Sequence, residues 1–360
     1  MALMAEDFHL PQIGDEQIKL LEHLSNACAV SGDEGEVRKI VLNEVRPHAD
    51  EVKVDALGNV LVTRQGSGEN RLKVMLAAHM DEVGLMLTHD SGEGIYRFDI
   101  VGGISTSDLA GKAVWIGKEH IPGVIGLKPV HLADGDSYQK PIDLEDMHID
   151  VGLAKGNENV GDRAAFATLF VQLGASLRGK ALDNRLGVAT LIELVKHAPP
   201  NIDLQAAFTV QEELGLRGAR VAAFAFNPDL AIILDSTPAY DMPDWEVDEN
   251  VRYNTRLGAG PAIYIADSST LSDPRLIRYI METAEEYKIP YQIRQPGGGG
   301  TDAGTIHKQR EGIPSISISV PGRYHHSPAS IARLSDWRHT WNLVATALSR
   351  LTPAVLASER

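Results

Sequence analysis

The sequence contains one cysteine and no long apolar run. Cys28 has no partner for an intramolecular disulfide, which is typical of proteins from reducing compartments. No segment approaches the ~18 uninterrupted apolar residues needed to cross a bilayer. The first residues also lack the basic head and apolar run of a secretory signal. We therefore expect a cytoplasmic protein that does not associate with membranes.

Aromatic residues and positive charge are also scarce. Aromatic residues make up 6% of the chain, and 34 Lys and Arg face 49 Asp and Glu, for a formal net charge of −15. This field would repel nucleic acid and anionic lipid, and no local basic stripe offsets it. No aromatic-rich strand is present to stack sugars, which disfavours a glycoside hydrolase cleft between two carboxylates.

The 360 residues exceed the ~250–300 at which single domains usually stop growing. Helical spacing, a hairpin-like strand pair and a buried strand come first, at residues 14–28, 34–48, 52–54, 59–63 and 73–78. From Val83 to Leu173 short β-type runs dominate and helical periodicity is nearly absent. We therefore expect a β-rich domain at 83–174, inserted into a larger domain formed by 1–82 and 175–360.

After Gly179 strand-like and helix-like segments alternate. The expected strands are 204–210, 230–234 and 314–320, and the expected helices are 184–197, 216–225, 273–287 and 335–350. This alternation predicts an α/β fold with a mostly parallel central sheet flanked by helices.

Residues with metal-binding side chains stand where these elements begin or end. They are His79 and Asp81, Asp183, the pair Glu212-Glu213, Asp235, and His325-His326. Taken by itself, Asp183 would be interpreted as a helix N-cap, and Asp235 as a residue that forms a turn. Together they are harder to explain, because buried carboxylates are costly without positive charge and these segments hold no Lys or Arg cluster. A pair of divalent cations would supply that charge, because mixed imidazole and carboxylate ligands suit Zn²⁺, with Co²⁺ or Mn²⁺ as alternatives.

Asp81 has a more specific expected role. His79 and Asp81 are two residues apart on an extended segment, so their side chains point to the same side. The Asp81 carboxylate is then well placed to accept the second ring N–H of His79 and fix its tautomer.

Six segments, in order and across nearly the whole chain, resemble the TET-type metallo-aminopeptidases. This family is also catalogued as glutamyl aminopeptidases and as cellulase-M-like proteins. The segments are Ala78-His-Met-Asp-Glu-Val-Gly84, Gly179-Lys-Ala-Leu-Asp-Asn-Arg185, Gln211-Glu-Glu-Leu-Gly-Leu-Arg-Gly218, Leu234-Asp235, Gly300-Thr-Asp-Ala303 and Arg323-Tyr-His-His-Ser-Pro328.

The resemblance implies a role for each matching position. One metal would be held by His79 and Asp235 and the other by Glu213 and His326, with Asp183 bridging and Glu212 as general base. His325 departs from the family pattern, because the position before the ligand histidine is usually not histidine. His131, inside the β-rich segment, would either contact the active site of a neighbouring subunit or play a structural role.

The resemblance also implies removal of N-terminal residues from short peptides, by a water activated between two metals. The resemblance further implies that 1–82 and 175–360 form the catalytic domain and that the inserted domain at 83–174 mediates dimers, which assemble into a hollow dodecamer. It also implies a cis peptide bond after Asp183. Alternatives from other classes remain open: a metal-dependent deacylase or amidohydrolase, an endoglucanase-like glycoside hydrolase, and a non-catalytic scaffold.

Overall fold

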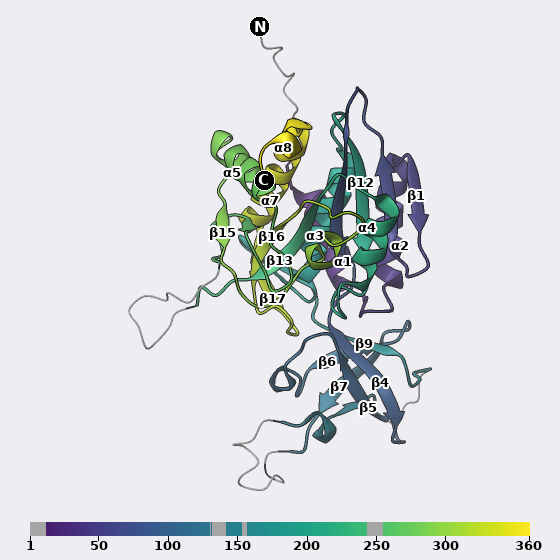
Figure 1. The fold of residues 1–360 in the computed structure, drawn as a ribbon. Helices are drawn as coiled ribbons and strands as arrows, with labels where there is room; N and C mark the ends of the chain where they lie inside the picture. Colours follow the sequence, from purple (N-terminus) through teal and green to yellow (C-terminus); the bar gives the residue numbers. More distant parts are fainter. Residues whose placement is uncertain (1–11, 130, 132–141, 153–156, 243–254) are drawn as a thin grey trace.

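Two separate sheets organise the chain (Figure 1). The computed structural model describes residues 12–129, 131, 142–152, 157–242 and 255–360. Parts of both expected domains lie outside the described residues: 1–11 and 243–254 of the larger domain, and 130, 132–141 and 153–156 of the β-rich domain. Among the described residues, the longest helices are too short or too polar to cross a bilayer.

The larger sheet has eleven strands among the described residues, and these strands come from the chain before and after the barrel. Nine strands follow in the spatial order β1 (Glu51–Val54), β2 (Val60–Arg64), β12 (Ile202–Thr209), β3 (Leu72–His79), β13 (Leu230–Pro238), β16 (Ser315–Arg323), β17 (Ser330–Arg333), β11 (Ser176–Gly179) and β10 (Val171–Leu173). Two short strands lie off this path: β14 (Ala262–Tyr264) pairs with β16 and with β15 (Gln292–Arg294).

The expectation of a mostly parallel sheet is wrong. Only the centre, β12-β3-β13-β16, and the pair β14-β15 are parallel. The strands outside this centre pair antiparallel, including the hairpin β1-β2 that the sequence predicts. Short connections account for the pairs β1-β2, β10-β11 and β16-β17, because strands joined by a tight turn can only run antiparallel. The pairs β2-β12 and β11-β17 are antiparallel although long stretches of chain separate their strands.

Helices cover both faces of the large sheet. They are α1 (Asp15–Asn26), α2 (Gly35–Val45), α3 (Leu182–Lys196), α4 (Arg217–Phe226), α5 (Pro274–Glu286), α6 (Ala303–Ile306), α7 (Leu334–Arg350) and α8 (Ala354–Ala357). Alternate β3 residues pack to opposite sides: Val74 and Leu76 join the core under α1, α3 and α7, whereas Met75 and Ala77 join the core under α4 and α6. Burial on both faces explains the uninterrupted apolar run of this strand.

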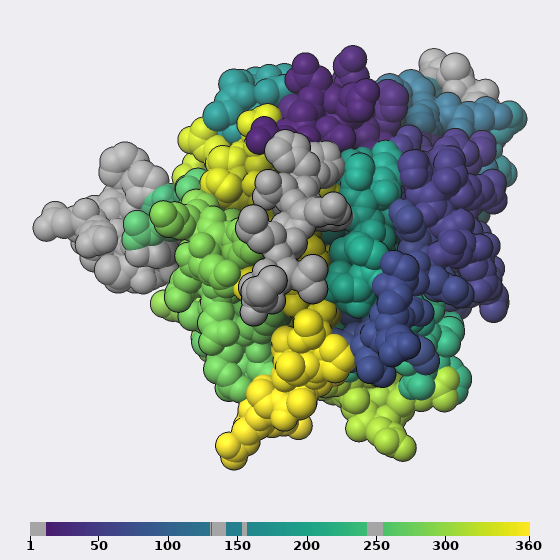
Figure 2. Space-filling model, turned by 90° about the horizontal axis from the view of Figure 1, so that it is seen from above, coloured from purple at the N-terminus to yellow at the C-terminus, as the bar shows by residue number. Residues whose placement is uncertain are grey.

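Chain segments far apart in sequence share the end of the molecule opposite the barrel. Figure 2 views this end, with early residues in purple and blue and C-terminal residues in green and yellow over the same face. The fully buried Trp337 of α7 donates its indole N–H to the Thr190 hydroxyl of α3 over 2.9 Å. The helix α7 therefore closes the same core that the early helices form.

The smaller sheet is a closed barrel of six strands, which Figure 1 shows below the larger sheet. The strands follow in the order β4 (Gly84–Asp90), β5 (Ile95–Val101), β8 (His148–Asp150), β7 (Ile121–Gly126), β6 (Ala113–Ile116) and β9 (Arg163–Phe166). Its own apolar core includes Leu85, Phe98 and Ile149. The described helices between Val83 and Leu173 are single 3₁₀ turns at Thr106–Asp108 and Leu144–Asp146, as the loss of helical periodicity predicts.

Candidate metal centre

The parallel centre of the large sheet gathers the candidate residues at one edge. His79 is the last residue of β3, and Thr209 at the end of β12 pairs with it in register. Glu212 and Glu213 follow Thr209 after a turn and therefore lie beside His79. Asp235 differs from expectation, because β13 continues to Pro238 and carries Asp235 within the strand, not after its end.

Asp183 enters the site from the start of α3. Its backbone is not helical (φ −83°, ψ 105°), and the bond between Asp183 and Asn184 is cis, as the resemblance predicts. The Asn184 side chain holds this turn, since its amide donates to the Leu234 carbonyl over 2.8 Å and accepts the Gly187 N–H over 3.0 Å. Asp183 is therefore not the ordinary N-cap that its position before a helix would indicate.

The two carboxylate oxygens of Asp183 face two different histidines. Oδ1 lies 3.3 Å from Nε2 of His79, and Oδ2 lies 3.6 Å from Nε2 of His326. Each histidine has a second carboxylate: Asp235 Oδ1 is 3.5 Å from His79 Nε2, and Glu213 Oε2 is 3.3 Å from His326 Nε2. All five residues expected as metal ligands therefore come together.

Two groups of potential metal ligands overlap at His79. His79, Glu212 and Asp235 form one group and His79, Asp183 and Glu213 the other, with the ligand atoms of each group within 4.8 Å of one another. Donor atoms this close, from imidazole and carboxylate, match the chemistry of divalent transition metals.

The structure separates the two adjacent histidines. His326 opens to the site, and its Nδ1 lies 2.9 Å from the Gly103 carbonyl, which leaves Nε2 directed at Asp183 and Glu213. His325 is 4% exposed, and its Nδ1 lies 3.4 Å from the Ser236 hydroxyl and 3.8 Å from Asp183 Oδ2. His326 is therefore the better placed of the two as a ligand. The described residue His131 is exposed in this chain.

Asp81 makes contacts that the sequence does not reveal. Nδ1 of His79 lies 3.2 Å from the Asp81 backbone oxygen and 3.6 Å from its carboxylate, so the expected contact with the carboxylate is the longer one. The carboxylate instead accepts the Ser31 hydroxyl over 2.6 Å and the N–H groups of Glu212 and Glu213 over 3.0 and 3.2 Å. Asp81 thus holds both the ring of His79 and the loop of the acidic pair.

The site concentrates negative charge away from water. Burial raises the pKa of Glu213 to about 8, and the nearby Asp183 charge adds to the rise. Burial also raises the pKa of Glu212 well above its usual range, and that of Asp302 to about 7. Burial alone would lower the pKa of His79, but the charge of Glu212 and the carboxylates of Asp183 and Asp235 raise it well above its ordinary value. The three carboxyl groups favour the protonated form because burial disfavours their charge, whereas His79 favours it because carboxylates surround it.

The positive charge nearby is already engaged. Lys180 binds both oxygens of Glu82 at 2.7 and 2.8 Å, and Arg185 reaches the same carboxylate at 3.1 Å. Among the described residues, the ion pairs of Asp183, Glu213 and Asp235 are all with histidines. The donor set therefore fits divalent cations, because they would supply the charge that the chain does not.

A cavity of about 640 Å³ opens onto this edge and is large enough for a peptide end. Besides the metal-binding side chains, it is lined by Tyr264, Ser268, Ser269, Arg294 and residues 298–300. The Arg294 guanidinium lies 4.4 Å from the centre of the Tyr264 ring and donates to the Gly298 carbonyl over 2.7 Å.

Sequence reasoning gave no role to several buried charged residues around the site. Asp302 is 1% exposed and accepts the Thr209 hydroxyl over 2.6 Å, and its other oxygen has no partner among the described residues. Arg185 donates to the backbone oxygens of Leu24, Met80 and Asp81. The available signal was their position inside the matching segments 179–185 and 300–303.

Comparisons with known proteins agree with this geometry. Residues 58–343 match the M42 glutamyl aminopeptidase family. A lysyl aminopeptidase of Pyrococcus furiosus is 32% identical over 93% of this chain and 97% of its own. The structure of aminopeptidase APDkam598 from Desulfurococcus kamchatkensis is 34% identical, covers 95% of this chain and 96% of its own, and superposes with a TM-score of 0.88.

A further solved structure bears on assembly. The TET1 peptidase of Pyrococcus horikoshii, which assembles into a tetrahedron or a large octahedral shell, is 31% identical over 93% of this chain and 100% of its own, with a TM-score of 0.81. A chain of PhTET1-12s, whose structure holds a dodecamer in the asymmetric unit, is 32% identical, covers 93% of this chain and 99% of its own, and superposes with a TM-score of 0.80. With a family match over most of its length and similarity over nearly all of it, this chain belongs to the M42 glutamyl aminopeptidase family.

Proposed function

We propose that this chain is a metal-dependent aminopeptidase that removes N-terminal residues from short peptides with the help of two divalent cations. The observation that carries the proposal is the arrangement of Asp183, whose Oδ1 faces His79 and whose Oδ2 faces His326. A carboxylate with one oxygen toward each histidine is suited to bridge two ions. Under this proposal His79 and Asp235 hold one ion, and Glu213 and His326 hold the other.

Zn²⁺ is the cation we propose first, with Co²⁺ or Mn²⁺ as alternatives that the same ligand types accept. When bound, a pair of such cations lowers the pKa of water and polarises a carbonyl group. The carboxylate of Glu212 then takes the proton of the attacking water and later delivers it to the leaving amine. Burial, together with the nearby carboxylates of Asp235 and Asp302, raises the pKa of Glu212 well above its usual range, which favours uptake of a proton at this position.

The residues around Glu212 position its carboxylate for proton transfer. Asp81 fixes the backbone of Glu212 and Glu213 through two hydrogen bonds, and the buried Asp302 lies close enough to influence the pKa of Glu212. The free α-amine of a substrate would be attracted to a bound cation or to nearby carboxylates of this edge. That attraction favours cleavage next to a free N-terminus.

We further propose that residues 83–174 form an inserted domain through which copies of the chain dimerise, and that dimers build a hollow dodecamer. The barrel strands lie between β3 and β10 in sequence, and both of those strands belong to the large sheet. Leu169 and Leu173 are 57% and 51% exposed and follow the barrel closely. A shell that encloses the active sites would restrict substrates to short unfolded peptides.

The unpaired Cys28 supports a reducing, cytoplasmic location.

A chelator experiment on aminoacyl-p-nitroanilides tests the activity. We expect hydrolysis to stop after chelation and to return with Zn²⁺ or Co²⁺. Release of an acyl group from N-acylated substrates, with none from free aminoacyl substrates, would instead indicate a deacylase. Activity that persists in the fully chelated protein would contradict the proposal. Comparing acidic, basic and apolar N-terminal residues in the same assay would define the side-chain preference.

A further inference from the structure

A second cluster of metal-binding side chains lies at the junction between the barrel and the large sheet. It consists of Cys28, Glu36 and His120, whose ligand atoms all lie within 4.8 Å of one another. Three separate segments contribute them: Cys28 follows α1, Glu36 lies in the first turn of α2, and His120 lies in the turn between β6 and β7. None of these residues belongs to the centre described above.

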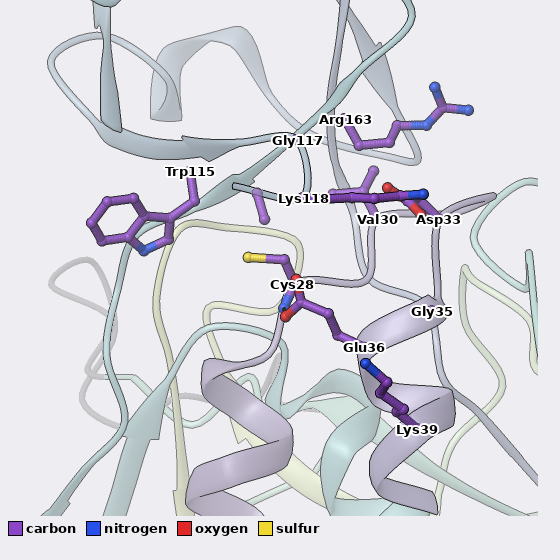
Figure 3. Close-up of a pocket in the computed structure, with 11 residues that line it drawn as sticks. Cys28, Val30, Asp33, Gly35, Glu36, Lys39, Trp115, Gly117, Lys118 and Arg163 are labelled. Atoms are coloured by element: carbon purple, nitrogen blue, oxygen red, sulfur yellow. Dashed lines mark hydrogen bonds between the residues drawn. The ribbon is translucent and has the colours of Figure 1, made fainter. Parts of the chain in front are cut away.

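The three side chains are held in place by direct contacts. Nε2 of His120 lies 2.5 Å from Oε1 of Glu36, and the other oxygen of Glu36 accepts the Cys28 backbone N–H over 3.0 Å. The His120 backbone has a positive φ of 51°, an uncommon conformation for this residue type. Figure 3 shows the Cys28 side chain beside the Glu36 carboxylate, at a cavity of about 330 Å³ that is also lined by Trp115.

We propose that Cys28, Glu36 and His120 bind one Zn²⁺-like transition-metal ion, separate from the catalytic pair. Thiolate, imidazole and carboxylate are the three side-chain types that bind Zn²⁺ in proteins, and a water molecule can complete a four-coordinate site. Ca²⁺ and Mg²⁺ are poor fits because they prefer oxygen ligands. The ligand atoms already lie within 4.8 Å of one another, and Nε2 of His120 and Oε1 of Glu36, now 2.5 Å apart, would move apart to admit an ion.

The charge of the three ligands allows a divalent ion here despite neighbouring cations. A thiolate and a carboxylate neutralise Zn²⁺, so that little net charge remains for the neighbouring cations to oppose. Those cations are Lys39, Lys118 and Arg163, which line the same cavity together with Asp33. The guanidinium of Arg163 is engaged elsewhere, because it donates to the backbone oxygens of Ser31 and Gly161.

The environment of Cys28 argues against redox reactivity. Burial raises the pKa of the Cys28 thiol to about 12, although the charge of Lys180 works in the opposite direction. A thiol with such a pKa stays protonated at neutral pH and is a poor nucleophile. A bound metal can displace this proton, and its binding would then release protons to the solvent.

Such an ion would connect two parts of the fold. Cys28 and Glu36 belong to the body built on the large sheet, whereas His120 belongs to the barrel. A bound ion would therefore fix the barrel to that body and stabilise the folded chain.

Cobalt substitution provides the test, because Cys28 is the only cysteine of the chain. Co²⁺ bound to a thiolate shows a charge-transfer absorption in the near ultraviolet, which carboxylate and imidazole ligands do not produce. We expect the full-length protein, titrated with Co²⁺ beyond the occupancy of the catalytic pair, to develop this band. Cys28→Ser should abolish the band and lower the bound metal by one ion per chain, with peptidase activity retained.

Variants of the other two ligands complete the experiment. His120→Gln and Glu36→Gln should each weaken the affinity that the band reports about tenfold or more. The matched control is His89→Gln, which changes an exposed histidine on β4 of the same barrel and should leave the band unchanged. Circular dichroism would verify folding. Absence of the band in the wild-type protein overturns the site, and so does a band that His120→Gln and Glu36→Gln do not weaken. Neither result depends on peptidase activity.

Discussion

The carboxylate of Asp81 binds the backbone of Glu212, the candidate general base: its Oδ1 accepts the Glu212 N–H over 3.0 Å. The other oxygen accepts the Glu213 N–H over 3.2 Å and the Ser31 hydroxyl over 2.6 Å. One buried side chain therefore sets the position of both members of the acidic pair. This contact explains why Asp81 matters to the site although its carboxylate is not the nearest partner of His79.

Replacing Asp81 with Asn should lower kcat about 10–100-fold, the range found for residues that orient metal ligands. The Asn amide offers one acceptor where Asp81 uses two oxygens, so that one N–H of the loop loses its partner. Steady-state kinetics together with metal analysis would measure the effect. Ser31→Ala removes only the hydroxyl contact and serves as the milder control. An Asp81→Asn enzyme with unchanged kcat would contradict a positioning role.

The variant Glu212→Gln should distinguish the role of a general base from that of a metal ligand. The change keeps the shape of the side chain but removes its ability to take a proton, so kcat should fall by ~10²–10⁴ with metal content unchanged. Asp183→Asn should instead lower the amount of bound metal, because it removes the charge placed between His79 and His326. Equal loss of metal in both variants would show that the two roles are assigned wrongly.

The buried ion cluster of Glu82, Lys180 and Arg185 should contribute strongly to the free energy of unfolding. Glu82 is 2% exposed and pairs with both Lys180 and Arg185, so Glu82→Gln leaves two buried cations uncompensated. We expect a loss of about 3–5 kcal/mol in the free energy of unfolding. The matched control is Glu286→Gln, which breaks the exposed pair with Arg350 and should cost about 1 kcal/mol or less. Denaturant unfolding at equal protein concentration would compare the two, and similar losses would contradict the prediction.

Asp336 should make stability depend on pH. Burial raises its pKa to about 6, against the hydrogen bonds from the Gly258 and Gly260 N–H groups that favour its ionised form. Between pH ~4 and ~6 the folded chain therefore holds a proton that the unfolded chain has released. The stability from this difference is present at low pH and is lost as the pH rises through about 6.

Asp336→Asn removes this titration. The melting temperature of the wild-type protein should therefore fall relative to that of Asp336→Asn as the pH rises from 4 through about 6. Above this window, up to pH 8, the two melting temperatures should run parallel. A constant difference across the whole range would show that the Asp336 pKa is close to its ordinary value.

The proposed assembly predicts a particle far larger than one chain. Size-exclusion chromatography with light scattering should give a mass well above the 39.1 kDa of the monomer, close to that of a dodecamer. Replacing the exposed Leu173 with Lys should weaken assembly if the segment after the barrel lies in a contact between copies. A stable, fully active monomer would contradict confinement of the active site within a shell.

The sequence alone determined the identities and local positions of most site residues. The apolar run at β3 ends in His79 and the run at β12 is followed by Glu212 and Glu213, so local periodicity already marked these residues. The run of buried residues also predicted that β3 is covered on both faces. The cis bond after Asp183 followed from resemblance, not from local physics.

Only the tertiary structure decided how these residues meet. The direction of neighbouring strands depends on contacts between distant segments, and so the antiparallel pairing around the parallel centre was not readable from local pattern. Strands of three or four residues, such as β14 and β17, carry too little periodicity to be recognised. The same holds for the choice between His325 and His326, because burial of one and exposure of the other depend on which chain segments pack over them. The junction of Cys28 and Glu36 with His120 likewise exists only once the barrel and the large sheet are packed together, since 84 residues separate Glu36 from His120.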